Sequence, residues 1–247
     1  MHIGPETRVA DLATQHPATI RIFQRHGIDF CCGGKRPLGE VCTEQKLSLA
    51  DLTRDLESAV STAREPGPDW EQMPLADLVR HIVDRYHRPL DEELPRLDQM
   101  MQKVLRVHGE RHAELTQVAG TFGAIVADLG PHMMKEERVL FPFVARLESV
   151  RPSGEAPVRS PFGSIQSPIG AMEAEHEIVG EALVRLKDLT TAFEAPADAC
   201  NTFRGLYHGF VELERELHEH IHVENNILFP RALRLEAGLL AAARGRG

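Results

Sequence analysis

Residues 132–142 read His-Met-Met-Lys-Glu-Glu-Arg-Val-Leu-Phe-Pro, and residues 220–230 read His-Ile-His-Val-Glu-Asn-Asn-Ile-Leu-Phe-Pro. Both stretches follow the pattern His-x3-Glu-x3-Leu-Phe-Pro, and the second begins 88 residues after the first. Residues four apart lie on one face of a helix, so each copy directs an imidazole and a carboxylate the same way. The Leu-Phe pair one turn further on predicts that this face points into a core.

The repeat extends toward the N-terminus. His87 precedes His132 by 45 residues, and His176 precedes His220 by 44. We therefore expect two helical hairpins related by a pseudo-twofold axis, which form an all-α four-helix bundle with inward-pointing His and Glu. In such a core the carboxylates can bridge two metal ions while imidazoles cap the ends, and mixed nitrogen and oxygen ligands suit iron or manganese.

Composition excludes several classes of protein. The chain has 247 residues, a net charge of −9 and a sequence pI of about 5.8. It shows no basic patch for nucleic acid and no apolar run long enough for a membrane span. A signal-peptide pattern is absent, and four cysteines, two of them adjacent, do not resemble a secreted disulfide framework. We therefore expect a cytoplasmic protein.

Turn-forming residues divide the chain. We expect a small helical domain over residues 1–64, a linker over 65–73 that contains Pro-Gly-Pro, and the bundle over 74–240. Small helices bury little surface by themselves, so the first domain should form a homodimer or dock on the rest of the chain. Residues 150–167 are rich in Pro, Gly and Ser and predict a surface loop.

Prolines predict irregular helices in the bundle. Pro89 and Pro95 should kink the first long helix, and Gly130-Pro131 should disturb the second just before His132.

Neighbouring side chains compete for the ligand positions in the repeat. Glu137 is next to Glu136, and His222 is close to His220, but only Glu136 and His220 keep the four-residue step in both copies. Three carboxylates flank His176 and either line an access path or form a solvated helix face. They are Glu173, Glu175 and Glu177.

Other histidines are less constrained by spacing. His81 lies six residues before His87 and off its face, and it is the alternative ligand at that position. His108 and His112 both lie near the turn between the first two long helices, and spacing favours neither.

Two adjacent cysteines stand in the motif Asp-Phe-Cys-Cys-Gly-Gly at residues 29–34. Adjacent cysteines are awkward to join to each other, and the Lys-Arg pair that follows should favour thiolate. We interpret Cys31 and Cys32 as exposed thiols for redox exchange or for holding a soft metal. Cys42 and Cys200 lack this context and are interpreted as small buried residues.

The Cys-Cys motif followed by two His-x3-Glu-x3-Leu-Phe-Pro units resembles the repair-of-iron-centres family, and the resemblance covers nearly the whole chain. These are hemerythrin-like proteins with a short N-terminal Cys-Cys domain. The resemblance implies two non-haem iron ions with a bridging oxo or hydroxo group, five His ligands and two bridging Glu. It favours His108 over His112, because the family has a ligand in a Val-His-Gly context. The matching positions are His87, His108, His132, Glu136, His176, His220 and Glu224.

The resemblance also implies a function. The family restores iron–sulfur clusters damaged by oxidative or nitrosative stress, so the expected partners are damaged or apo iron–sulfur proteins that receive iron. An alternative is a nitric oxide reductase in which Cys31 and Cys32 pass electrons. A hemerythrin-like sensor or carrier of oxygen or nitric oxide ranks last, because a carrier needs no Cys-Cys domain. The 150–167 segment is longer than the connection usual in the family.

Overall fold

The computed structural model describes residues 3–63, 68–153 and 163–244. Regular structure in these ranges is helical, apart from one isolated bridge between Arg8 and Pro37. The all-α prediction is confirmed.

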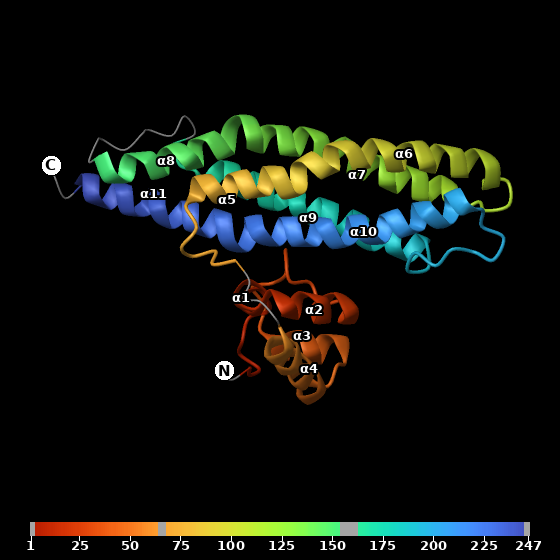
Figure 1. Ribbon diagram of the computed structural model, residues 1–247, viewed down its shortest axis with the longest axis horizontal. Helices are drawn as coiled ribbons and strands as arrows, with labels where there is room; N and C mark the ends of the chain where they lie inside the picture. Colours follow the sequence, from red (N-terminus) through yellow and green to blue (C-terminus); the bar gives the residue numbers. More distant parts are fainter. Residues whose placement is uncertain (1–2, 64–67, 154–162, 245–247) are drawn as a thin grey trace.

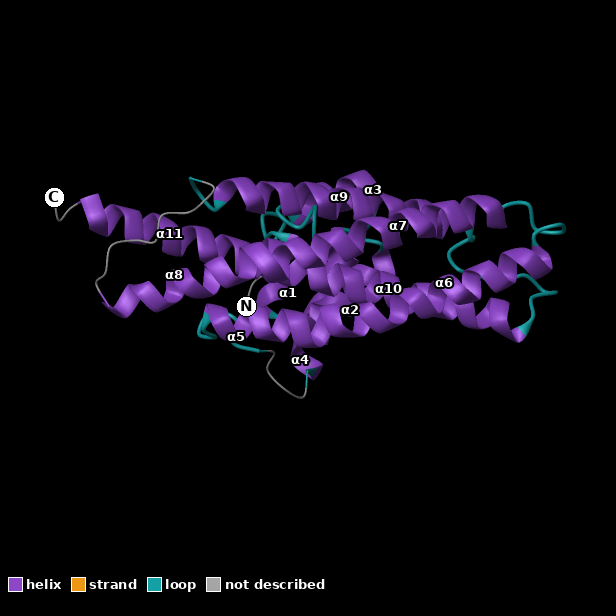
Figure 2. Cartoon of the chain, turned by 90° about the horizontal axis from the view of Figure 1, so that it is seen from above, coloured by secondary structure: helices purple, strands orange, loops and turns teal. Residues whose placement is uncertain are grey.

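Four long rods lie side by side along the long axis of the molecule (Figures 1 and 2). Three of them consist of two α-helices joined by a short π-helical segment. The first rod is α5 (Leu75–Ile82), η2 (Val83–His87) and α6 (Arg88–His108), and the second is α7 (Leu115–Lys135), η3 (Glu136–Leu140) and α8 (Phe141–Ser153). The third is α9 (Gln166–Leu189), and the fourth is α10 (Asn201–Val223), η4 (Glu224–Leu228) and α11 (Phe229–Arg244).

Each π-helical segment ends just before a residue that precedes proline. The backbone N–H of that residue bonds to the carbonyl five residues back: Arg88 to Val83, Phe141 to Glu136, and Phe229 to Glu224. Proline has no backbone N–H to donate, and the wider π-helical turn accommodates the hydrogen bond that is therefore missing from the helix. Such turns often occur at functional sites, and these three contain His87, Glu136 and Glu224.

Two predictions about the rods are corrected. α7 continues through Gly130 and Pro131, and the irregular turn begins at Glu136 instead. The predicted loop over 150–167 is too long at both ends, because α8 extends to Ser153 and α9 begins at Gln166. Residues 154–162 of that loop lie outside the described residues.

Apolar side chains form one cluster at each end of the bundle. One contains Leu97, Phe122 and Phe210 from α6, α7 and α10, and the other contains Leu78 and Phe229 from α5 and α11. Along every rod, the His and Glu of the repeat lie between residues of the two clusters. The polar centre is therefore enclosed by apolar packing on both sides.

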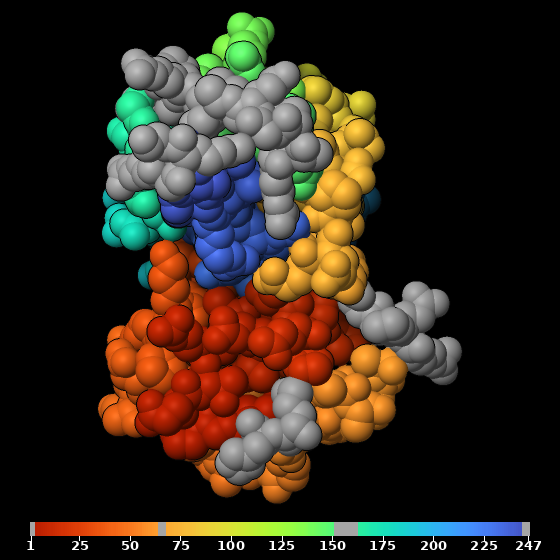
Figure 3. All heavy atoms as spheres, turned by 90° about the vertical axis from the view of Figure 1, so that its left-hand side faces the viewer, coloured from red at the N-terminus to blue at the C-terminus, as the bar shows by residue number. Residues whose placement is uncertain are grey.

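Four short helices form an N-terminal unit with its own core: α1 (Val9–Gln15), α2 (Ile20–His26), α3 (Leu38–Gln45) and α4 (Leu49–Thr62). This unit docks against the bundle, as Figures 1 and 3 show. His222 Nδ1 donates to the Phe30 carbonyl oxygen at 3.0 Å, and Asn226 Nδ2 donates to that of Cys31 at 2.9 Å. Among the described residues, no helix is long and apolar enough to cross a membrane.

Candidate metal centre

Six side chains of the repeat converge at the middle of the bundle. None is more than 2% exposed, and all four rods contribute: they are His87, His132, Glu136, His176, His220 and Glu224.

These side chains form two overlapping groups of four. The ligand atoms of His87, Glu136, His220 and Glu224 all lie within 4.8 Å of one another, and so do those of His132, Glu136, His176 and Glu224. Both carboxylates belong to both groups, whereas each histidine belongs to one. The arrangement matches two adjacent cation positions that share two carboxylates.

Hydrogen bonds on the outer side orient three of the four imidazoles. In each case Nδ1 faces an oxygen acceptor, so Nδ1 carries the proton and Nε2 has its lone pair directed inward. The pairs are His87 with Glu137 Oε1 at 3.0 Å, His132 with Glu175 Oε2 at 2.8 Å, and His176 with Asn225 Oδ1 at 2.8 Å.

The atoms that face the centre fit a metal pair. His87 Nε2 lies 3.0 Å from His220 Nε2, and His132 Nε2 lies 3.0 Å from His176 Nε2. Both oxygens of Glu136 are buried without a hydrogen-bond partner among the described residues, and Oε2 of Glu224 lies 3.1 Å from His176 Nε2. Converging lone pairs and orphaned carboxylate oxygens are costly when buried, and bound cations would satisfy them.

The two carboxylates differ in the metal-free protein. Burial, and then the charge of Glu224, raises the pKa of Glu136 well above its usual range. Burial also acts to raise the pKa of Glu224, but the nearby imidazoles, His220 first and then His176 and His87, outweigh it and lower that pKa well below the usual range. Burial lowers the pKa of His132 to about 4. A neutral imidazole is the form that binds a metal.

The direction of each side chain shows which of the neighbouring carboxylates faces the centre. Glu136 points inward, whereas Glu137 orients His87 from outside. Glu175, one of the three carboxylates flanking His176, orients His132. Sequence reasoning missed Asn225, yet a signal existed: it occupies in the second copy the place that Glu137 occupies in the first.

His108 does not belong to this centre, which corrects the expectation of seven shared ligands. It ends α6, 21 residues after His87 in the same rod, and therefore lies roughly 30 Å away along the axis. Its Nε2 atom lies 3.2 Å from Cys200 Sγ instead. His81 is also excluded, because it packs between Trp70 and Tyr86.

The Cys-Cys loop is built around the Asp29 carboxylate. It accepts backbone hydrogen bonds from Cys31, Cys32 and Gly33 at 2.9, 3.0 and 2.7 Å, and the Cys31 thiol donates to it at 3.2 Å. A Cβ atom at Gly34 would lie 2.4 Å from the backbone oxygen four residues earlier, so only glycine fits there.

The predicted thiolate is wrong for Cys31. Its side chain is buried, and the hydrogen bond with Cys32, then burial, raises the pKa of the thiol well above its usual range. The expected cations point elsewhere: Lys35 pairs with Glu173 at 3.3 Å, and Arg36 pairs with glutamates of α3. The two sulfur atoms lie 3.9 Å apart and are not joined.

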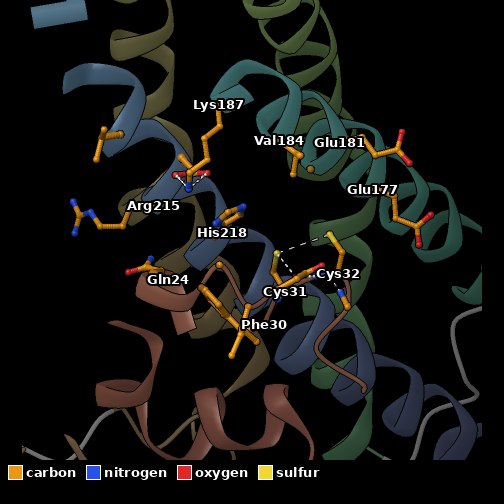
Figure 4. Close-up of a pocket in the computed structure, with 17 residues that line it drawn as sticks. Gln24, Phe30, Cys31, Cys32, Glu177, Glu181, Val184, Lys187, Arg215 and His218 are labelled. Carbon is orange, nitrogen blue, oxygen red and sulfur yellow. Dashed lines mark hydrogen bonds and ion pairs between the residues drawn. The ribbon is translucent and has the colours of Figure 1, made fainter. Parts of the chain in front are cut away.

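A cavity of about 880 Å³ lies between the Cys-Cys loop and helices α9 and α10. Figure 4 shows the residues that line it. Cys31 and Cys32 line it, together with Glu177, Lys187 and His218. Cys32 is half-buried and borders this cavity.

The two remaining cysteines differ from each other. Cys42 is buried, as predicted, but Cys200 is exposed, which corrects its interpretation as a buried residue.

Comparison with known families agrees with this geometry. Residues 78–232 match the model of the hemerythrin HHE cation binding domain, and residues 5–60 match the ScdA_N model, a domain of unknown function. The bundle and its buried cluster thus define a hemerythrin-like, cation-binding protein.

Similarity to curated proteins narrows the family. The chain is 42% identical over 225 residues to the iron-sulfur cluster repair protein YtfE of Yersinia pseudotuberculosis serotype IB (strain PB1/+) and to that of Yersinia pestis (strain Pestoides F). Each alignment covers 91% of this chain and 96% of the relative. The chain belongs to the repair-of-iron-centres family.

Proposed function

We propose that this protein binds two iron ions through the six converging side chains and supplies iron to iron–sulfur clusters damaged by oxidative or nitrosative stress. The observation that carries the proposal is the pair of overlapping ligand groups that share Glu136 and Glu224. Buried carboxylates that bridge and imidazoles that cap are the donor set of helical di-iron centres. The names of the Yersinia relatives support the repair function.

The six ligating groups favour transfer of iron to an iron–sulfur cluster. Each cation position offers two imidazoles and two shared carboxylates, and no thiolate is among the six groups. Iron–sulfur clusters are held by cysteine thiolates, which are softer ligands than carboxylates. Iron at this centre is therefore an exchangeable ion that a thiolate-rich recipient can take up.

Surface ion pairs hold two of the ligand rings. Glu137, which orients His87, also accepts a hydrogen bond from Arg88 at 2.8 Å. Glu175, which orients His132, also pairs with Lys135. A recipient protein that contacts the exposed Arg88 and Lys135 side chains would weaken the support of one imidazole at each metal position. Docking of the recipient would in this way promote release of iron.

The Cys-Cys loop is attached to the rod that carries His220 and Glu224. Its backbone is held by His222 and Asn226, which lie on the same rod but face the N-terminal unit. We therefore assign Cys32, on the cavity wall, to the contact through which iron or the recipient is engaged.

Anaerobic iron transfer tests the proposal. Iron-loaded protein is mixed with an apo-ferredoxin and sulfide, and cluster formation is followed by absorbance against an equal concentration of free ferrous iron. We expect faster formation than with free iron, and formation that survives a moderate chelator. Transfer that is no faster than free iron, or that the chelator abolishes, would refute directed donation.

Cysteine variants distinguish the role of the Cys-Cys loop from that of the metal centre. Changing Cys31 and Cys32 together to Ala should leave iron content unchanged and slow transfer, whereas the control Cys42→Ala should transfer like wild type. Nitric oxide consumption under the same anaerobic conditions tests the alternative. Many turnovers per centre would favour a reductase, and a single stoichiometric reaction would not.

A further inference from the structure

A second group of metal-ligating side chains lies at one end of the bundle, away from the iron centre. His108 ends α6, and His112 lies in the turn that follows; Asp198 and Cys200 lie in the segment that leads into α10. Both connections meet at the end of the molecule opposite the C-terminus (Figure 1). The group therefore joins two segments that are about 90 residues apart in the sequence.

Three of these side chains lie close to metal-binding spacing, and the fourth, Cys200, contacts one of them, His108. Cys200 Sγ lies 3.2 Å from His108 Nε2, and Asp198 Oδ1 lies 3.1 Å from His112 Nε2. Ligand atoms of His108, His112 and Asp198 all lie within 4.8 Å of one another. Zinc bonds of 2.0–2.3 Å in a tetrahedral site place ligand atoms roughly 3.3–3.7 Å apart.

His108 is only 4% exposed, and its two ring nitrogens have different surroundings. Nε2 faces Cys200, whereas the buried Nδ1 atom has no hydrogen-bond partner among the described residues. Cys200 is the residue before the first turn of α10. The helix N-terminus thus favours the thiolate that a metal requires.

Charges around the group are mixed. Asp198 also faces Arg111 at 3.7 Å, and His112 Nδ1 lies 3.0 Å from Glu114. The positive charge of Lys103 acts electrostatically on the Cys200 thiol. A bound divalent cation would be compensated by the Asp198 carboxylate and the Cys200 thiolate.

A nucleophilic role for the Cys200–His108 pair fits less well. In such a pair a third group normally orients the histidine through its other nitrogen. His108 Nδ1 has no such group among the described residues.

We infer that His108, His112, Asp198 and Cys200 bind a zinc ion that joins the α6–α7 turn to the segment before α10. Two imidazoles, a carboxylate and a thiolate form a donor set that suits zinc, and four protein ligands are typical of a structural site. The site is separated from the iron centre by roughly 30 Å along the first rod, so it is independent of iron donation.

Cobalt substitution tests the site in iron-loaded, full-length protein. We expect one equivalent of Co²⁺ to bind with the thiolate charge-transfer and visible bands of a tetrahedral site, and Zn²⁺ to displace it. Cys200→Ser should lose the charge-transfer band, and His112→Ala should weaken binding at least about 100-fold. Even the loss of an outer hydrogen-bond partner weakens metal binding by about 10–100-fold.

Matched controls locate the ion. Cys42→Ser, which removes a buried thiol of the N-terminal unit, should keep the charge-transfer band, and iron content and helicity should be unchanged in all variants. Loss of the band in Cys42→Ser but not in Cys200→Ser would overturn the inference. So would the absence of cobalt binding to iron-loaded wild type, or equal affinity in His112→Ala and wild type. A variant that fails to fold is replaced by Asp198→Asn, judged on the same affinity.

Discussion

Replacing Glu136 by Leu should abolish the iron centre and yet stabilise the metal-free protein. Glu136 is fully buried, and neither of its carboxylate oxygens has a hydrogen-bond partner among the described residues. A buried polar group without a partner costs about 1–3 kcal/mol, whereas an apolar group of similar shape does not incur this cost. We therefore expect the free energy of unfolding of metal-free Glu136→Leu to exceed that of metal-free wild type by about 1–3 kcal/mol.

The gain should depend on pH. The pKa of Glu136 is raised in the folded state, mainly by burial and then by Glu224. A carboxyl with a raised pKa contributes full stability below its unfolded pKa of about 4.3, and this contribution is lost as pH rises through the folded pKa. The advantage of Glu136→Leu over wild type should therefore be larger at about pH 8 than at about pH 5.

Urea unfolding followed by circular dichroism measures both effects on chelator-stripped and iron-loaded protein. Glu137→Leu is the matched control, because Glu137 is the next residue but is partly exposed and bonded to His87 and Arg88. The control should show no gain. With iron, the order should reverse, because only wild type gains binding energy. If metal-free Glu136→Leu is no more stable than wild type, or shifts as the control does, the reasoning about orphaned oxygens is refuted.

Further predictions concern the ligands and the Cys-Cys loop. His176→Ala should lower the iron content from two ions to one per chain, whereas His108→Ala should keep the wild-type iron content. Metal analysis of both purified variants tests this. Equal losses of iron would mean that His108 is a ligand of the iron centre after all. Gly34→Ala places a Cβ atom 2.4 Å from a backbone oxygen and should cost about 1–3 kcal/mol of stability, while Gly180→Ala, with its nearest neighbour at 3.9 Å, should cost far less in the same urea titration. Alkylation of Cys31, followed by mass spectrometry, should be slow near neutral pH, because the side chain is buried and its raised pKa keeps the thiol protonated. Rapid reaction at that pH would contradict this.

The helical repeat in the sequence determines much of the bundle. A residue and its neighbour four positions on share a helix face whatever the rest of the chain does, so His132 with Glu136 and His220 with Glu224 could be paired from spacing alone. The duplication extended the inference to His87 and likewise to His176. It also contained the position of Asn225, through its equivalence with Glu137.

Register between helices was decided only by the tertiary structure. Spacing within one chain segment does not say which residue of another rod lies opposite, and so the pairing of His87 with His220, and of His132 with His176, came from packing. His108 shows the same limit. A local Val-His-Gly resemblance placed it at the iron centre, but the rigid 1.5 Å rise of a continuous helix carries it to the far end of the bundle, beside Cys200.

The protonation of Cys31 was also beyond the sequence. The pKa of a thiol depends on the groups that pack against it in the folded protein. Here Lys35 and Arg36 pair with glutamates. The hydrogen bond with Cys32, burial and the nearby Asp29 carboxylate raise the pKa of Cys31. Sequence by itself determined the all-α bundle and the residue types of its centre, because these follow from periodicity within helices. The tertiary structure decided the partners of each ligand and the environment of each thiol, because these depend on contacts between segments distant in the chain.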